Sequence, residues 1–182
     1  MPQERIRKMV IAGAMSAISI VLGLTHWGFI PWFSGASLTI MHVPVIIATV
    51  LEGPLVGLMV GLIFGLFSML QAALAPTGPA DVWFTNPLLS VLPRLFIAPI
   101  AWSLWWIFKR WQVFAILIAG VGGSLTNTLF VLGMIGVMGY LPWTALIPIS
   151  ALNGIPEAVV SAILTLGVVA AWRQINIGKA DL

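Results

Sequence analysis

The stretch LVGLMVGLIFGLFSMLQAALA, residues 55–75, decides the fold class of this sequence. It contains no Asp, Glu, Lys or Arg, and about 20 apolar residues are enough for one helix to cross the hydrocarbon core of a bilayer. A membrane-spanning β-strand would instead alternate polar and apolar positions over about ten residues. Unbroken apolar runs that carry scattered Gly and Ala therefore indicate α-helices in lipid.

The composition of the whole chain supports this class. Of the 182 residues, 60% are hydrophobic and 7% are charged, whereas a soluble domain carries about a quarter charged residues. So few polar side chains cannot cover a globule in water, and backbone groups in lipid must be satisfied within helices. We therefore expect an all-α integral membrane bundle that forms one domain over residues 1–182.

Proline, glycine and charged residues divide the chain into six expected spans. Glu52-Gly53-Pro54 interrupts one apolar run, because Gly and Pro together end helices. A loop rich in Pro, Gly and Asp follows the third span, and Lys109-Arg110 ends the fourth. The expected transmembrane ranges are 9–24, 38–51, 55–75, 87–108, 113–139 and 149–171.

The basic residues test this number of spans. With the N-terminus in the cytoplasm and six crossings, all Lys and Arg residues except Arg94 fall in the inner segments. An excess of Lys and Arg in cytoplasmic loops is typical of multi-pass membrane proteins. The sequence therefore predicts an N-in, C-in topology, and the net charge of +3 needs no nucleic-acid partner. The inner basic residues are Arg5, Arg7, Lys8, Lys109, Arg110, Arg173 and Lys179.

Arg94 lies inside the fourth expected span, about two helical turns from its outer end. An ionisable side chain at such a position costs at least ~2.5 kcal/mol on insertion scales, so it should face a cavity or a partner. In one interpretation Arg94 pairs permanently with Glu157, which lies at a similar depth in the sixth span. In the other, Arg94 binds an anionic substrate and Glu157 holds Arg94 in place. The two interpretations are compatible, because a ligand can use a structural pair.

Polar residues at helical spacing extend this candidate site along three spans. Residues four apart share a helix face, and stripes of this kind occur in the fourth, fifth and sixth spans. Polar side chains also join membrane helices to one another, but three stripes that converge at one level favour a substrate-binding site. The helical candidates for substrate binding are Arg94, Glu157, Asn153, Asn86, Ser90 and Asn127.

Aromatic and histidine side chains supply the remaining binding candidates. Trp27, Trp32 and Trp83 lie near the outer boundary, where an aromatic belt is the ordinary explanation. Because their loops would converge over one mouth, they are also candidate pocket residues. His26 and His42 are too few and too far apart in sequence for a metal site, so His42 is kept as a binding candidate without metal or cofactor.

Catalytic signatures are missing from the sequence. It has no HExxH, GxSxG or P-loop pattern. The absence of cysteine excludes thiolate chemistry and disulfides. We therefore expect a protein that is not an enzyme.

Small residues recur at four-residue spacing in the first and third spans. Such ridges allow helices to approach closely, either within one bundle or against a partner protein. In the third span a glycine occupies every fourth position from Gly53 to Gly65. In the first span the small pairs are Ala12/Ser16 and Gly13/Ala17.

Two longer stretches carry a family resemblance. SLTIMHVPVIIATVLEGPLVGLMVGLIFGLFSMLQA (residues 37–72), followed by NPLLSVLPRLFIAPIAW (residues 86–102), resembles the substrate-binding S components of energy-coupling factor (ECF) vitamin transporters. The resemblance implies a six-helix protein of a prokaryotic cell (inner) membrane that binds a vitamin or precursor near the outer face. In that family the outer loops and the fourth to sixth helices form the pocket.

The resemblance also implies partners. S components dock through a small-residue motif of the first helix onto a transmembrane coupling protein that carries two cytoplasmic ATPases. Here Gly13-xxx-Ala17 matches that motif and Ala12-xxx-Ser16 lies beside it.

The identity of the ligand stays open at this point. Arg94 suits a carboxylate or phosphate and favours pantothenate. Trp27, Trp32, Trp83 and Phe84 suit a flat ring, which keeps pyridoxine, folate, riboflavin and a pyrimidine as candidates. The alternative function is a self-sufficient secondary carrier or channel for a small organic anion. That function predicts inverted repeats and ionisable groups near the bilayer midplane, and the sequence shows no convincing repeat.

Overall fold

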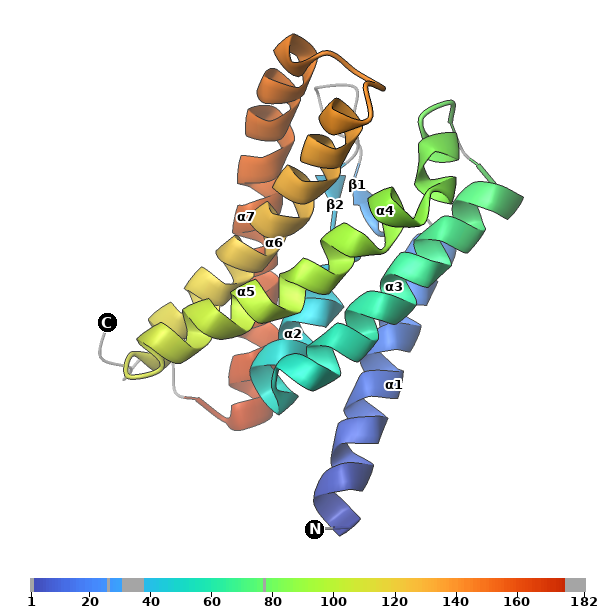
Figure 1. The fold of residues 1–182 in the computed structure, drawn as a ribbon. Helices are drawn as coiled ribbons and strands as arrows, with labels where there is room; N and C mark the ends of the chain where they lie inside the picture. The colour runs from blue at the N-terminus through green and yellow to red at the C-terminus, as the bar shows by residue number, and fades with distance from the viewer. Residues whose placement is uncertain (1, 26, 31–37, 77, 176–182) are drawn as a thin grey trace.

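A computed structural model describes residues 2–25, 27–30, 38–76 and 78–175 of the chain, and nearly all of this part is helical (Figure 1). The helices are α1 (Pro2–Leu24), α2 (Val43–Glu52), α3 (Pro54–Leu74), the 3₁₀ helix η1 (Asp81–Thr85), α4 (Pro87–Ser90), α5 (Leu92–Phe108), α6 (Gln112–Val137) and α7 (Trp143–Arg173). Two short strands, β1 (Phe29–Ile30) and β2 (Leu38–Thr39), pair antiparallel between α1 and α2. The protein is an all-α membrane bundle.

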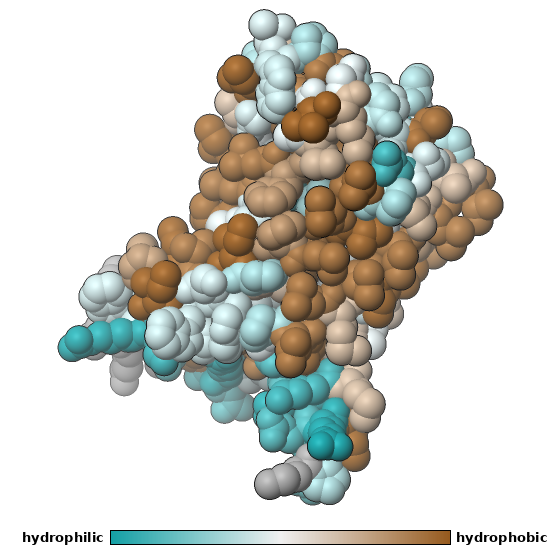
Figure 2. Space-filling view, viewed as in Figure 1, coloured by the Kyte–Doolittle hydropathy of each residue, from teal (hydrophilic) through white to brown (hydrophobic). Residues whose placement is uncertain are grey.

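Five helical segments are long and apolar enough to cross a membrane, and these are α1, α3, α4 with α5, α6 and α7. One further apolar helix, α2, is shorter than these five. Its ten residues span about 15 Å, half of a typical hydrocarbon core. Residues 43–50 are all buried, so α2 is a central core helix that the other helices surround. Figure 2 shows a broad apolar surface across the middle of the molecule, above hydrophilic patches at the bottom and lower left.

The helices differ from the expected spans in three places, and prolines are involved in each. The second span does not start at residue 38, because β2 occupies that position and α2 begins only at Val43 with Pro44 in its first turn. The fourth span divides at Val91, just before Pro93 in the first turn of α5. The sixth begins at Trp143 and runs through Pro148. Membrane helices tolerate internal proline because neighbouring groups satisfy the backbone.

The glycine face of α3 packs inside the bundle. Gly57 faces Thr49 of α2, and a methyl group added to Gly61 would lie 2.7 Å from the carbonyl oxygen of Arg94 in α5. At Gly65 the same addition would lie 2.8 Å from the Cα of Val91. These distances are shorter than van der Waals contact, so the missing side chains let α3 lie directly on α2 and α5.

Basic side chains gather at one end of the bundle. The described Lys and Arg residues other than Arg94 occupy the start of α1, the end of α5 and the end of α7, which Figure 1 places on the lower side of the molecule. The other end contains the β1–β2 pair, η1 and α4. The basic residues at the lower end are Arg5, Arg7, Lys8, Lys109, Arg110 and Arg173.

Candidate functional site

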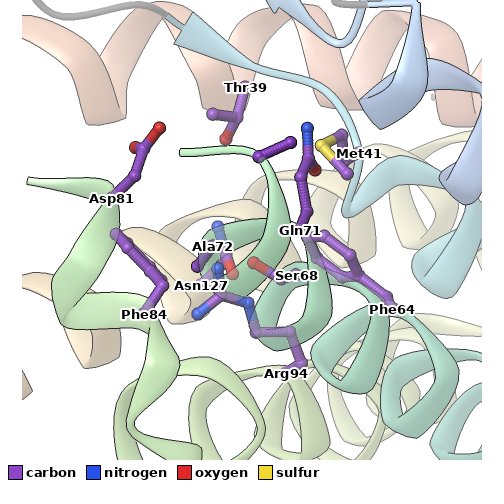
Figure 3. Close-up of a pocket in the computed structure, with 11 residues that line it drawn as sticks. Thr39, Met41, Phe64, Ser68, Gln71, Ala72, Asp81, Phe84, Arg94 and Asn127 are labelled. Carbon is purple, nitrogen blue, oxygen red and sulfur yellow. The ribbon is translucent and has the colours of Figure 1, made fainter. Parts of the chain in front are cut away.

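A cavity lies at the end of the bundle opposite the basic residues, where α3 ends and α5 begins. Its empty space measures about 590 Å³ when the part that is open to the outside is counted. Its walls come from α3, from the segment that joins β2 to α2, from η1, and from single residues of α5 and α6 (Figure 3). The lining residues are Thr39, Met41, Phe64, Ser68, Gln71, Ala72, Ala75, Asp81, Phe84, Arg94 and Asn127.

Arg94 forms part of the cavity wall. It lies in the first turn of α5, two residues after Leu92, where the helix begins. Its side chain is buried, with 6% of the residue exposed, and one terminal nitrogen donates a hydrogen bond of 2.7 Å to the carbonyl oxygen of Leu89. The guanidinium carbon lies 5.2 Å from the ring centroids of both Phe64 and Phe84. Figure 3 shows these rings on opposite sides of the guanidinium. The cation–π contacts therefore fix the guanidinium in one orientation.

No carboxylate neutralises Arg94 within the described part of the chain. The ion pairs found there are Arg7–Glu52 and Lys8–Glu4, and the Nε of Arg94 has no hydrogen-bond partner among these residues. A buried charge without a counterion costs several kcal/mol. The permanent Arg94–Glu157 pair that the sequence allowed is absent, because Glu157 accepts hydrogen bonds from Thr39 and Thr128 instead.

Asn127 of α6 lines the same cavity. Only 6% of this residue is exposed, and its Oδ1 has no hydrogen-bond partner among the described residues. Two residues of the cavity lining, Arg94 and Asn127, therefore each have one buried polar atom, a donor and an acceptor respectively, without a partner among the described residues. A guanidinium binds a carboxylate through two parallel hydrogen bonds, so this arrangement fits a ligand with a carboxylate and a nearby hydrogen-bond donor.

The sequence matches the family described as ECF transporter, substrate-specific component, over residues 7–169. The chain belongs to this family. A comparison with curated proteins finds no match. The family makes this protein a substrate-binding S component, a membrane-embedded transporter subunit that works with ECF module partners. It also confirms the resemblance that residues 37–72 and 86–102 carry.

Two of the predicted site residues of the S component, Asn86 and Ser90, have structural contacts and do not line the cavity. The Oδ1 of Asn86 accepts a hydrogen bond of 2.9 Å from the backbone N–H of Leu88 and so caps α4. The hydroxyl of Ser90 donates to the carbonyl oxygen of Phe84. The Ser90 bond holds η1 on α4 and so helps to place Phe84 beside Arg94.

Three further candidates lie behind the cavity wall. Glu157 and Asn153 are buried on α7 one turn apart, and neither lines the cavity. His42 is fully buried next to Met41, and neither ring nitrogen has a hydrogen-bond partner in the described part of the chain. Of the members of the helical stripes, only Arg94 and Asn127 line the cavity.

Neither Trp27 nor Trp83 lines the cavity of this S component. Trp83 stacks on Tyr140 with ring centroids 5.1 Å apart and an interplanar angle of 1°. Trp27 is 81% exposed, as expected for a residue of an interfacial aromatic belt. Trp32 lies outside the described residues.

The sequence reasoning missed the contribution of α3. Phe64, Ser68, Gln71 and Ala72 share one face at spacings of three and four residues and form one wall of the cavity. Ser68 and Gln71 are polar residues in an otherwise apolar span, which was a usable signal. Nothing comparable marked Met41 or Thr39.

The two small-residue ridges of α1 face different ways. Ala12 and Ser16 are each 5% exposed and pack inside the bundle, so they are not available to a partner. Gly13 and Ala17 lie on the exposed side of α1, and a methyl group added to Gly13 would meet nothing within 4 Å. Of the two ridges, only Gly13/Ala17 is therefore open to a partner.

Metal binding finds no support in the described residues. Within them, no group of three or more His, Cys, Asp or Glu side chains is placed to hold an ion.

Proposed function

We propose that this S component binds a vitamin or vitamin precursor that carries a carboxylate, with pantothenate as the favoured ligand. The observation that carries the proposal is the state of Arg94. Its guanidinium is buried, held between two aromatic rings, and lacks a carboxylate partner among the described residues. A ligand carboxylate would supply the missing charge where the low dielectric makes the interaction strong.

The rest of the cavity sets further requirements for the ligand. Asn127 offers an acceptor for a ligand hydroxyl or amide N–H. Ala72 and Met41 offer apolar surface, while Gln71 and Thr39 add polar groups to the lining. Pantothenate combines a carboxylate, an amide, hydroxyls and a short aliphatic chain, and so meets each requirement. A flat ring system would have to stack on Phe64 or Phe84, whose rings already contact Arg94.

The charge distribution supports uptake into the cell. The basic residues at the end opposite the cavity are expected to face the cytoplasm. The cavity then faces the outside of a prokaryotic cell membrane, with both termini inside. A ligand would be captured from outside before transport.

The energy for transport would come from partners. The sequence has no P-loop pattern for nucleotide binding, so any active transport would draw its energy from a partner. We assign the transmembrane coupling protein, which carries the two cytoplasmic ATPases, to the exposed Gly13/Ala17 ridge of α1, where small residues allow close helix contact.

A thermal-shift screen of the detergent-purified protein tests the proposal. The screen compares pantothenate, pyridoxine, folate, riboflavin and a pyrimidine. A ligand that binds only the folded state raises the unfolding temperature by mass action, so pantothenate should give a saturable rise of several degrees. A shift with only the compounds that lack a carboxylate would contradict the role of Arg94. No shift with any compound would contradict the vitamin-binding function.

A further inference from the structure

The carboxylate of Glu157 joins three elements. Its Oε1 accepts hydrogen bonds from the backbone N–H of Thr39 at 2.6 Å and from the Thr39 hydroxyl at 3.3 Å. Its Oε2 accepts a hydrogen bond of 2.8 Å from the hydroxyl of Thr128. Glu157 belongs to α7, Thr39 to β2 and Thr128 to α6, so one side chain connects two helices to the strand between α1 and α2.

Both partners of Glu157 belong to the wall of the cavity or adjoin it. Thr39 lines the cavity directly, and Thr128 follows Asn127, which also lines it. The helices that carry these contacts lie close together at this level. A methyl group added to Gly154, one turn before Glu157, would lie 3.4 Å from the Cγ2 of Thr128.

The strand that Glu157 holds has little support of its own. β2 contains two residues and pairs only with β1, through Phe29 with Thr39 and Ile30 with Leu38. An isolated two-stranded ribbon is marginally stable. The segment after β2 is anchored to α1, because the hydroxyl of Ser19 donates a hydrogen bond of 3.1 Å to the carbonyl oxygen of Met41. The Glu157 contacts supply the anchor on the opposite side, towards α6 and α7.

A structural role in helix packing does not explain a carboxylate at this position. Glu157 is 5% exposed and forms no ion pair with a described Lys or Arg. A hydrophobic side chain of similar size would join α6 and α7 without the desolvation cost of a buried acid. A hydrophobic side chain could not accept a hydrogen bond from the backbone N–H of Thr39, and that N–H would lose the partner it has in Glu157.

We propose that Glu157 is a positioning residue that clamps β2 against α6 and α7 and so keeps the cavity wall at Thr39 closed. The side chain acts through Thr39 and Thr128 and does not contact the ligand. Any effect of the Glu157 clamp on how long a ligand stays bound rests on the proposed function. The closure of the wall does not, and the experiment below measures that closure without any ligand.

Cysteine labelling measures the closure directly, because the chain contains no cysteine. Ala72→Cys places a reporter on the cavity wall at a residue that is 6% exposed, and Ala80→Cys places the matched control in the exposed turn before η1. The rate of reaction with a membrane-impermeant maleimide is measured for each reporter with Glu157 intact and with Glu157→Ala.

The clamp predicts that Glu157→Ala accelerates labelling at position 72 by about tenfold or more, since losing hydrogen bonds to a charged group shifts a local opening equilibrium by that factor. Labelling at position 80 should stay unchanged. Thr128→Val keeps the side-chain volume and removes the bond from α6 to Glu157, together with a 3.3 Å bond from the Thr128 hydroxyl to the Ser124 carbonyl oxygen inside α6. It leaves both Thr39 contacts of Glu157 in place, so it should accelerate labelling in the same direction but less. An unchanged rate at position 72 in folded Glu157→Ala overturns the proposal. If Glu157→Ala fails to fold, an unchanged rate in Thr128→Val overturns it.

Discussion

Gly61 of α3 lies against the backbone of Arg94, so close that a methyl group on Gly61 would stand 2.7 Å from the Arg94 carbonyl oxygen. The residue that supplies the buried charge of the cavity is therefore positioned by a glycine on a neighbouring helix. Phe64, one turn along α3, contacts the guanidinium of the same arginine. The glycine spacing of α3 thus serves the site as well as the packing of the bundle.

Gly61→Ala should lower both stability and ligand affinity. The contact is with backbone, which cannot rotate away, and overpacking a close helix contact typically costs about 1–3 kcal/mol. The measurement is the thermal unfolding midpoint in detergent, together with the Kd for the ligand. Gly167→Ala makes the same chemical change on α7 where nothing lies within 4 Å, and it should leave both quantities unchanged. Equal effects in the two variants would contradict the assigned contact.

Arg94→Ala should lower ligand affinity by at least about tenfold while the protein still inserts and folds, since a hydrogen-bonded charge pair contributes more than the ~1.4 kcal/mol that this factor represents. Isothermal titration with the best ligand of the vitamin screen measures the loss. Arg110→Ala removes a positive charge from an exposed position at the other end of the bundle and serves as the control. Unchanged binding in Arg94→Ala would remove Arg94 from the site.

Asn127→Asp should block binding of an anionic ligand by adding a second carboxylate, besides that of Asp81, to the lining of the cavity that Arg94 shares. The substitution is nearly isosteric, so shape is kept while the new charge neutralises Arg94 and repels the ligand carboxylate. We expect the affinity to fall by more than about tenfold, because like charges a few ångströms apart in a low dielectric cost well over 1 kcal/mol. Gln112→Glu makes the same change at the exposed start of α6 and should bind normally. Normal binding by Asn127→Asp would argue against an anionic ligand.

Ala17→Trp should leave ligand binding intact and abolish uptake, because the indole would separate α1 from a helix packed on the Gly13/Ala17 ridge. The assay is accumulation of labelled vitamin by cells that make the variant together with the ECF module, compared with binding to the purified protein. Ile163→Trp places the same side chain on the exposed face of α7, where Ile163 is 62% exposed, and should transport normally. Normal uptake with Ala17→Trp would contradict the docking surface.

The helical membrane fold was predictable from sequence because lipid leaves few alternatives for an apolar backbone. Residues 55–75 and the position of Gly53 located α3 and the break before it, and Gly53 adopts a φ of 94°, which favours glycine. The start of α2 was not predictable. Residues 38–42 lead without a break into the apolar run that begins at Val43, so the sequence does not separate them from the helix. In the structure, however, Leu38 and Thr39 pair with a strand whose position depends on the whole bundle.

The candidate site was predicted in part. Arg94 stood out because a charge inside an apolar span is costly, and that argument needs no structure. The partner of Glu157 was not predictable, because similar depth on two helices does not determine which neighbour a side chain faces. Thr39 and Glu157 are 118 positions apart in the sequence. Helical spacing cannot predict a contact between residues so far apart.

The most direct test of the carboxylate-binding cavity compares one ligand with its neutral analogue. Equilibrium titration of the purified protein with pantothenate and with panthenol, which has an alcohol in place of the carboxylate, isolates the group assigned to Arg94. We predict that pantothenate binds at least about tenfold more tightly than panthenol, the factor that corresponds to ~1.4 kcal/mol of charge-assisted hydrogen bonding. Equal affinities for the two compounds would contradict the assignment of Arg94 to the ligand carboxylate.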